Sequence, residues 1–101
     1  MITKKYLKTK PVCKVTFAVQ PEEHKGAEKI ALVGDFNEWD NKSTLLKKTK
    51  SGKFSATLDL ETGKEYQFRY LIDEKLWEND WAADNYVPNN LTFEENSVVA
   101  V

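Results

Sequence analysis

The hydrophobic and polar positions of this chain alternate with a period of two along three stretches, residues 12–19, 54–60 and 65–73. This period is typical of strands that bury one face, because successive side chains of a strand point to opposite sides. In the last stretch the aromatic side chains share one face, which we expect to be core. Gln67 and Arg69 fall on the other face, where we expect them to meet solvent two positions apart.

Shorter apolar runs at residues 29–33 and 97–101 add two strands, and a return strand begins at residues 76–77. Residues 45–46 form a further short strand or an anchoring contact. Turn-forming Gly, Asn and Asp residues separate these runs, and no useful length of the chain has a helical period. The pattern therefore predicts an all-β fold, an antiparallel β-sandwich of about seven strands.

Residues 33–40, VGDFNEWD, run from a buried strand into a polar loop that contains two aromatic side chains. Gly34 follows the apolar run at once, which indicates a turn or a close approach of two backbones. Short polar side chains that can hydrogen-bond to the local backbone hold such a loop without a helix: Asp35, Asn37 and Asp40. Of Phe36 and Trp39, one can anchor the loop to the core while the other faces outward, and the sequence leaves open which does which.

The composition is that of a globular protein, with 41% of the 101 residues hydrophobic and 31% charged. No apolar run approaches the roughly 20 residues of a membrane-spanning helix, so we expect no contact with a membrane. Cys13 and His24 are the single cysteine and the single histidine. This count excludes an intramolecular disulfide and a metal site of clustered Cys and His; it permits a reducing compartment, and we expect a cytoplasmic protein. We expect Cys13 to pack as a small apolar residue and His24 to be solvated in a polar loop.

The net charge of −1 is unevenly distributed along the chain. Residues 1–60 contain 12 Lys and Arg against 7 Asp and Glu, a balance of +5, whereas residues 61–101 contain 3 against 9, a balance of −6. We expect residues 1–10 to be a solvated basic arm and residues 11–101 to be a single domain. The overall balance argues against a nucleic-acid partner, which needs a basic face across the domain. The basic arm and the acidic second half can also attract each other between two copies of the chain.

Groups of residues that carry out catalysis are missing from the sequence. It has no glycine-rich phosphate loop, no metal-ligand spacing and no usable set of Ser, His and Asp. A glycosidase needs two carboxylates across a cleft, one of them with its pKa raised by burial. The adjacent acids at residues 22–23 and 94–95 lie in polar segments instead. We therefore expect a protein that is not an enzyme and uses no cofactor.

Several motifs, taken in order, resemble a known family. They are ALVGDFNEWD, GKFSATLDL and GKEYQFRYLID, a tryptophan four residues later and a closing NSVVAV, and they lie within residues 13–101. This order resembles the isoamylase-type early-set domain, the carbohydrate-binding module that precedes the catalytic barrel of starch-debranching and glycogen-branching enzymes. The glycogen-binding domain of the AMP-activated kinase β subunit is of the same type. The resemblance implies an immunoglobulin-like sandwich, here as a module standing alone without the barrel.

The resemblance also implies which residues bind sugar. Trp39 and Trp77 match the family's two stacking tryptophans, and Arg69 takes the place of its hydroxyl-binding lysine. Asn96 matches the family's hydroxyl-binding asparagine, and Gln67 can assist from beside Arg69. This chemistry suits glucose, since an indole covers the apolar face of the ring while Arg, Asn and Gln pair with its hydroxyl groups.

The sequence departs from the family's pattern in three places. Glu74 replaces a turn glycine in a loop that is one residue longer; because Glu tolerates positive φ poorly, we expect a turn of a different shape. The family's Asp-Pro after the second tryptophan is here Asp80 followed by Trp81. Some relatives push a leucine into the curved glucan, and here Leu91 is the candidate, with Phe93 or no contact as the alternatives.

Our hypothesis is a non-catalytic module that binds α-1,4-linked glucan such as glycogen or starch, with a glycogen-metabolism enzyme or a kinase-like protein as partner. The alternative is a protein-interaction or regulatory module on the same sandwich without sugar binding. Trp39 and Trp77 rings that are exposed and roughly coplanar would favour the sugar, and two buried rings the protein partner. We expect Trp81 and Tyr86 to pack within their loop, with an extended sugar platform as the alternative.

Overall fold

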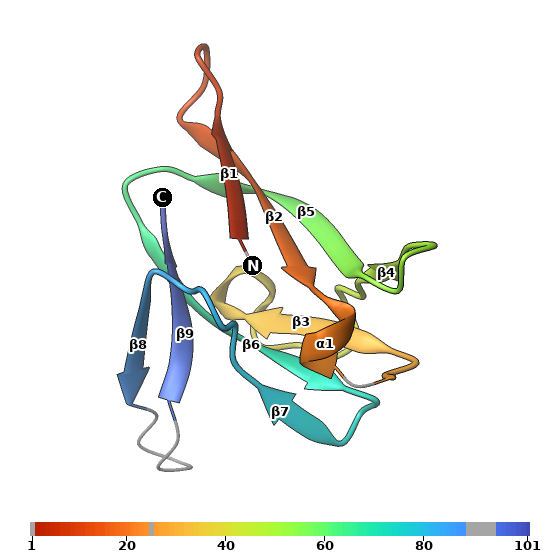
Figure 1. Cartoon of the computed structure of the whole chain (residues 1–101). Coiled ribbons are helices and arrows are strands. Elements are labelled where there is room, and N and C mark those ends of the chain that lie inside the picture. Colours follow the sequence, from red (N-terminus) through yellow and green to blue (C-terminus); the bar gives the residue numbers. More distant parts are fainter. Residues whose placement is uncertain (1, 25, 89–94) are drawn as a thin grey trace.

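The computed structural model describes residues 2–24, 26–88 and 95–101, which form two antiparallel sheets packed face to face (Figure 1). The first sheet has the order β1–β2–β5–β4, with bounds β1 (Ile2–Tyr6), β2 (Val12–Val19), β5 (Phe54–Glu61) and β4 (Lys47–Lys48). The second has the order β3–β6–β9–β8, with bounds β3 (Ile30–Gly34), β6 (Glu65–Ile72), β9 (Glu95–Ala100) and β8 (Asn85–Pro88). A short strand, β7 (Leu76–Glu78), also pairs with β6. Two helical turns, α1 (Pro21–His24) and the 3-10 helix η1 (Asp35–Asn37), follow β2 and β3.

The core lies between the two sheets and is built from the inward side chains of the alternating strands. Phe17 of β2 and Phe68 of β6 are fully buried, and their rings meet edge to face with centroids 5.1 Å apart. Phe54 of β5 is 2% exposed. Cys13 is fully buried in the same cluster, so the prediction that it packs as a small apolar residue is confirmed. The predicted all-β antiparallel sandwich is confirmed as well.

The described residues contain nine strands where the sequence predicted about seven. The pattern missed β1 and β8, because neither has the apolar alternation of a half-buried strand. The short strand β4 lies at Lys47–Lys48, whereas at residues 45–46 Leu45 forms an isolated bridge with Ala31. β1 instead pairs with β2 over five positions, from Ile2 opposite Phe17 to Tyr6 opposite Cys13. Residues within the expected basic arm are therefore a paired strand, while the division of the chain into an arm and one domain stays a prediction.

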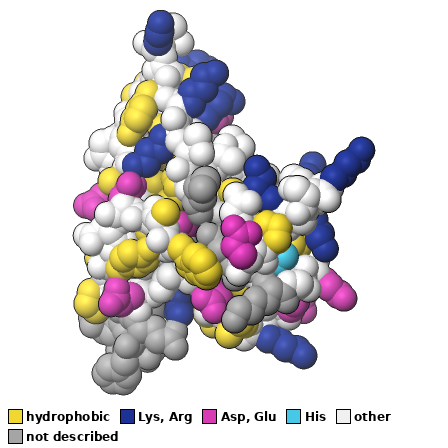
Figure 2. All heavy atoms as spheres, viewed as in Figure 1, with side chains coloured by type: hydrophobic (Ala, Val, Ile, Leu, Met, Phe, Trp, Pro, Cys, Tyr) yellow, Lys and Arg dark blue, Asp and Glu magenta, His cyan; other side chains and the backbone are white. Residues whose placement is uncertain are grey.

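The basic first residues and the acidic second half meet within one chain. Figure 2 shows Lys and Arg side chains gathered at the end of the molecule where β1 and β2 lie. Lys4 of β1 donates from Nζ to Asp84 Oδ2 at 2.7 Å, and the same oxygen accepts the backbone N–H of Ala100 at 2.8 Å. Asp84 thus joins Lys4 of the first strand to Ala100 of the last strand, β9, within the same molecule.

His24 is 8% exposed, so the prediction that it is solvated is wrong. Its Nδ1 accepts the backbone N–H of Ala27 at 3.1 Å, which leaves Nε2 to donate to Gly52 O at 2.8 Å. The ring also meets Phe54 edge to face at 5.0 Å. The histidine is buried because α1 folds the polar loop back onto the β4–β5 hairpin. No helix within the described residues is long and apolar enough to cross a membrane.

β6 is the central strand of the second sheet and pairs with three other strands. β3 pairs along one edge of β6, from Ile30 opposite Ile72 to Gly34 opposite Phe68. The other edge is shared, because β9 pairs with the first half of β6 and β7 with its last three residues. Among the described strands β7 has no second partner, so it is an edge strand.

Candidate functional site

The loop after β3 presents Trp39 and anchors Phe36. The Phe36 ring lies 5.5 Å from that of Phe17 and 6.3 Å from that of Phe68, against the core. Trp39 is 37% exposed. The question that the sequence left open is thereby answered: Phe36 anchors the loop and Trp39 faces outward.

Short polar side chains hold this loop, as predicted. Asn37 Oδ1 accepts the backbone N–H of Gly34 at 3.0 Å, and Asn37 Nδ2 donates to Leu32 O at 2.8 Å. Asp40 Oδ1 accepts the backbone N–H of Lys42 at 2.8 Å. The amide of Asn37 thus connects the loop to the last residues of β3.

Glu38 and Trp39 both have the left-handed backbone conformation, each with φ of 58°. The N–H of Trp39 donates to Gly34 O at 2.9 Å and closes the turn. For a residue with a Cβ this conformation costs about 1–2 kcal/mol. Strain of this kind is often stored at functional positions, and here it falls on the residue that the loop presents.

Arg69 points to the outer face of the second sheet, which we define by Ala31, Val33, Gln67, Arg69, Leu71, Trp77 and Asn96. Val33 lies opposite Arg69, and Leu71 lies opposite Trp77, so these side chains share a face. The guanidinium carbon of Arg69 is 5.6 Å from the centre of the Trp77 ring, within the range of a cation–π contact. Arg69 is on the predicted face, but the expectation that it meets solvent is wrong. It is 6% exposed, and the indole of Trp77 lies over its guanidinium.

A chain of hydrogen bonds joins the Trp39 loop to β9 across the outer face. Trp39 Nε1 donates to Asp35 Oδ1 at 2.8 Å, and Asp35 Oδ2 accepts the backbone N–H of Gln67 at 2.8 Å. Gln67 Oε1 then accepts from Asn96 Nδ2 at 3.1 Å. The sequence predicted only a local backbone role for Asp35. The signal that was available is the i, i+4 spacing of Asp35 and Trp39 within the loop.

The turn that leads to Trp77 places two acidic residues at positive φ. Asp73 has φ of 51° and Glu74 has φ of 61°, and the N–H of Lys75 donates to Ile72 O at 3.0 Å, as in a type I′ turn. The structure thus puts Glu74 in the conformation that Glu tolerates poorly. Glu74 Oε1 accepts from Lys29 Nζ at 2.7 Å, and Asp73 Oδ1 accepts the backbone N–H of Lys29 at 2.9 Å. These contacts fix the turn to the start of β3.

The segment after β7 is held by a buried carboxylate. Asp80 is 2% exposed and accepts from the hydroxyl of Tyr70 at 2.6 Å, while its backbone N–H donates to Ser97 Oγ at 2.9 Å. The hydroxyl of Tyr86 donates to Asp80 O at 2.5 Å, in keeping with the predicted packing role of Tyr86. Trp81 is 65% exposed, so the same prediction for Trp81 is wrong.

Four of the predicted site residues lie on the outer face, and hydrogen bonds link the Trp39 loop to it. Asp35 joins Trp39 to Gln67, Gln67 accepts from Asn96, and Arg69 contacts Trp77, which is 40% exposed. Leu91, like Phe93, lies outside the described residues. In the part of the chain that is described, no group of three His, Cys, Asp or Glu side chains could hold a metal ion. Two half-exposed indoles beside an arginine and two amides are the groups that a sugar-binding surface uses.

The sequence matches, over residues 19–97, the family described as the glycogen recognition site of AMP-activated protein kinase. This match spans most of the 101 residues, so the chain belongs to this family of carbohydrate-binding modules. A search of the curated proteins found no match. The resemblance that the motifs indicated is therefore confirmed at the level of the family.

Proposed function

We propose that this chain binds α-1,4-linked glucan of the glycogen or starch type without catalysing a reaction. Trp39 and Trp77 stack on glucose rings, Arg69 and Asn96 hydrogen-bond to hydroxyl groups, and Gln67 assists. The observation that carries the proposal is that one half-exposed indole, Trp77, lies against Arg69, and a second, Trp39, is linked by hydrogen bonds through Asp35 to Gln67 and Asn96. Family membership supports the same conclusion, because the family is described by its recognition of glycogen.

The polar groups of this face are arranged before the ligand arrives. Arg69 and Asn96 are each 6% exposed, and Asn96 Nδ2 donates to Gln67 Oε1 at 3.1 Å. Trp39 is tied to Asp35, and Trp77 lies against Arg69. Little side-chain entropy is then lost on binding, which favours a ligand that makes only shallow contacts. We expect dissociation constants between about 1 mM and about 1 μM, or roughly −4 to −8 kcal/mol.

A binding role fits the carboxylates of this face better than hydrolysis does. Glycoside hydrolysis needs two carboxylates on either side of the scissile bond, one of them able to donate a proton. The acid that contacts the proposed sugar residues is Asp35, and both of its oxygens already accept hydrogen bonds, from Trp39 and from Gln67. A glycogen-metabolism enzyme or a kinase-like protein as partner stays a prediction, as does the cytoplasmic location.

Titration with maltoheptaose and β-cyclodextrin tests the proposal, with cellohexaose as the β-linked control and with calorimetry and tryptophan fluorescence as readouts. We expect saturable binding of the two α-glucans alone. Trp39→Ala should weaken this binding at least tenfold, because one of the two stacking rings is lost, whereas the fold should survive. Tyr6→Ala is the matched control, since Tyr6 is an aromatic side chain on β1 that is 55% exposed. Unchanged binding by Trp39→Ala would refute the assignment of the site, and a flat response to every sugar would refute the function.

A further inference from the structure

We propose a second saccharide subsite on the other side of β7, with Trp81 as its stacking ring and glucose units of the same α-glucan as its occupant. This inference rests on the proposed function, and it adds a surface that the sequence motifs do not assign. It is carried by a hollow, by one highly exposed indole and by one carboxylate that faces the hollow.

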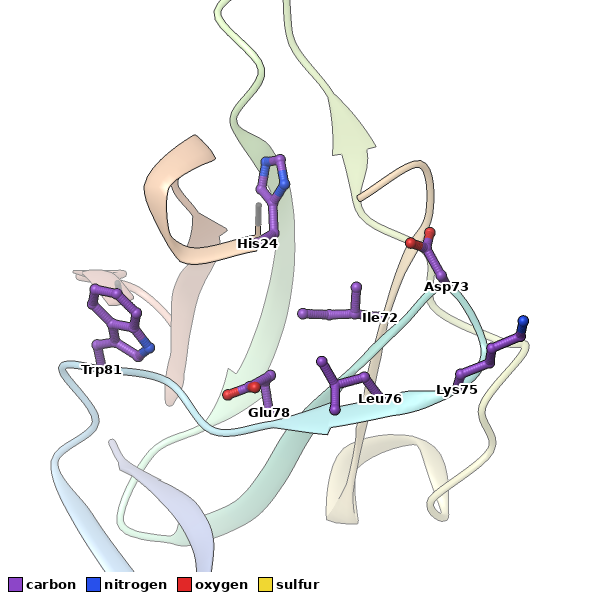
Figure 3. A pocket seen from close by; sticks show the side chains of 7 residues that line it. All are labelled: His24, Ile72, Asp73, Lys75, Leu76, Glu78 and Trp81. Atoms are coloured by element: carbon purple, nitrogen blue, oxygen red, sulfur yellow. The ribbon is translucent and has the colours of Figure 1, made fainter. Parts of the chain in front are cut away.

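The hollow has a volume of about 440 Å³ and lies between α1, the end of β6, β7 and the segment that follows β7. Its lining consists of His24, Ile72, Asp73, Lys75, Leu76, Glu78 and Trp81. In Figure 3, Leu76 and Ile72 lie at the middle of the hollow, Trp81 lies at one end of it, and Glu78 lies between Trp81 and Leu76. The volume is within the range of about 300–1,000 Å³ that small-molecule sites occupy.

The hollow and the outer face lie on opposite sides of the same edge strand. Trp77 is opposite Leu71 and therefore belongs to the outer face, whereas Leu76 is opposite Ile72, whose side chain belongs to the core side of the sheet. Successive residues of a strand alternate, so Glu78 points to the same side as Leu76. One short strand thus carries a stacking ring on one face and part of a second binding surface on the other.

Trp81 has the largest exposed fraction among the large hydrophobic side chains that the structure describes, at 65%. Leu76, also in the hollow, is 54% exposed. An indole left this open presents both its face and its Nε1–H to a ligand. The apolar C–H face of a glucose ring can stack on it, and Leu76 extends the apolar contact.

Glu78 supplies the polar part of this surface. Its carboxylate is half-buried and has no hydrogen bond or ion pair with any other described residue. A carboxylate can accept from two adjacent sugar hydroxyls at once. Asp73 and His24 line the hollow, but polar atoms of both are already hydrogen-bonded within the protein. Asp73 Oδ1 accepts two backbone N–H groups, and both ring nitrogens of His24 are engaged. Lys75 lines the end of the hollow opposite Trp81, and its amine points away from it (Figure 3).

Two subsites, one on each side of β7, would let the module hold two segments of a branched polymer. The second segment then binds at a high local concentration, so affinity for the polymer exceeds affinity for a short oligosaccharide. We expect Trp81→Ala to weaken co-sedimentation with glycogen by about tenfold or more. We expect it to leave the affinity of the first subsite for β-cyclodextrin unchanged.

Calorimetric titration of the full chain with β-cyclodextrin is the experiment that tests the second subsite. We expect two molecules bound to the wild-type chain, one to Trp81→Ala and one to Trp39→Ala. Glu78→Ala should weaken only the second site, Glu78→Gln should retain most of its affinity, and Trp81→Phe should keep a stacking ring. Asp59→Ala is the control, as it removes an exposed carboxylate from β5 on the other sheet.

The outcomes separate this inference from the proposed function. One molecule bound to the wild-type chain, or an unchanged stoichiometry in Trp81→Ala, overturns the second subsite while the outer face keeps its role. If Trp39→Ala and Trp77→Ala leave binding intact and Trp81→Ala removes it, the outer-face proposal fails and the hollow remains. Circular dichroism and the melting temperature of each variant show whether a loss of binding is a loss of the fold.

Discussion

Trp39 and Asp35 are joined by a hydrogen bond of 2.8 Å from the indole Nε1–H to the carboxylate, and the other carboxylate oxygen accepts the backbone N–H of Gln67. Asp35 therefore sets the direction of the ring relative to β6. We expect Asp35→Ala to weaken α-glucan binding about tenfold and to cost about 1 kcal/mol of stability. Without this bond we expect Trp39 to adopt several orientations, and its fluorescence emission to shift to longer wavelength.

Asp40→Ala is the matched control for Asp35→Ala, because Asp40 lies in the same loop and accepts one backbone N–H, that of Lys42. It should affect the stability of the loop but not the emission of Trp39. Equal losses of sugar binding in the two variants would mean that Asp35 acts only by holding the loop. Calorimetry and emission spectra of both variants decide between these roles.

Gly34 is required because a side chain does not fit at this position. Its backbone is not the reason, since its φ of −173° is extended and open to any residue. A Cβ at this position would lie 2.5 Å from Gln67 O and 2.7 Å from Phe68 Cβ. We expect Gly34→Ala to destabilise the fold by about 2–3 kcal/mol, because neither atom is the end of a flexible side chain. Gly63→Ala meets no atom within 4 Å but has φ of 77°, so it should cost about 1 kcal/mol. Denaturant unfolding of the two variants compares them, and a larger loss for Gly63→Ala would contradict this account.

Glu38 has φ of 58° and is exposed. We expect Glu38→Gly to raise the free energy of unfolding by about 0.5–1 kcal/mol, because glycine has no Cβ penalty in the left-handed conformation. Glu65→Gly, in the extended backbone of β6, should lower it by about 0.5–1 kcal/mol. Thermal melts of the two variants test these predictions. If Glu38→Gly is the less stable of the two, the left-handed conformation of Glu38 does not strain the fold.

Asp84 should make stability depend on pH. Partial burial acts to raise the pKa of Asp84, but hydrogen bonds from Lys4 Nζ and from the N–H of Ala100 outweigh it, so the pKa lies below its ordinary 3.8. A carboxyl group whose pKa is lower in the folded state stabilises the fold above its unfolded value and loses that contribution as the pH falls through the folded value. We therefore expect wild-type stability to drop below pH 3.8, the ordinary value, more steeply than that of Asp84→Asn.

Urea unfolding of wild type and Asp84→Asn between about pH 7 and about pH 2 measures this difference. Asp59→Asn is the control, because its ion pair with Lys14 is 3.6 Å long and exposed. Parallel curves for wild type and Asp84→Asn would show that the contact between Lys4 and Asp84 does not contribute to stability in solution.

The sequence predicts the strands that bury one face, because alternation is a direct consequence of that burial. Residues 12–19 were predicted as a strand and β2 spans Val12–Val19, and the strand predicted at residues 65–73 is β6, Glu65–Ile72. β1 was missed because its stability comes from pairing with β2 and not from an apolar face. His24 was misplaced for a related reason, since its burial depends on Gly52, which is distant in the sequence.

For the site, the sequence predicts which residues share the outer face but not how exposed they are. The alternation of β6 put Gln67 and Arg69 together, yet the cover that Trp77 provides for Arg69 depends on the short strand β7. The choice between Phe36 and Trp39 depends on packing against Phe17 across the core. The role of Asp35 depends on a contact with Gln67, which lies 32 positions further along the chain. Contacts between distant segments leave no periodic signal, so only the folded chain reveals them.

Because the Trp77 ring covers Arg69, this tryptophan also hides a permanent positive charge from solvent. A protein that lost the ring would not simply bind neutral sugar less well. It would also lose the aromatic face that lies against the guanidinium, and Arg69 should become more open to water beside Gln67 and Asn96. The ring of Trp77 therefore also sets the surroundings of the charge that lies against it.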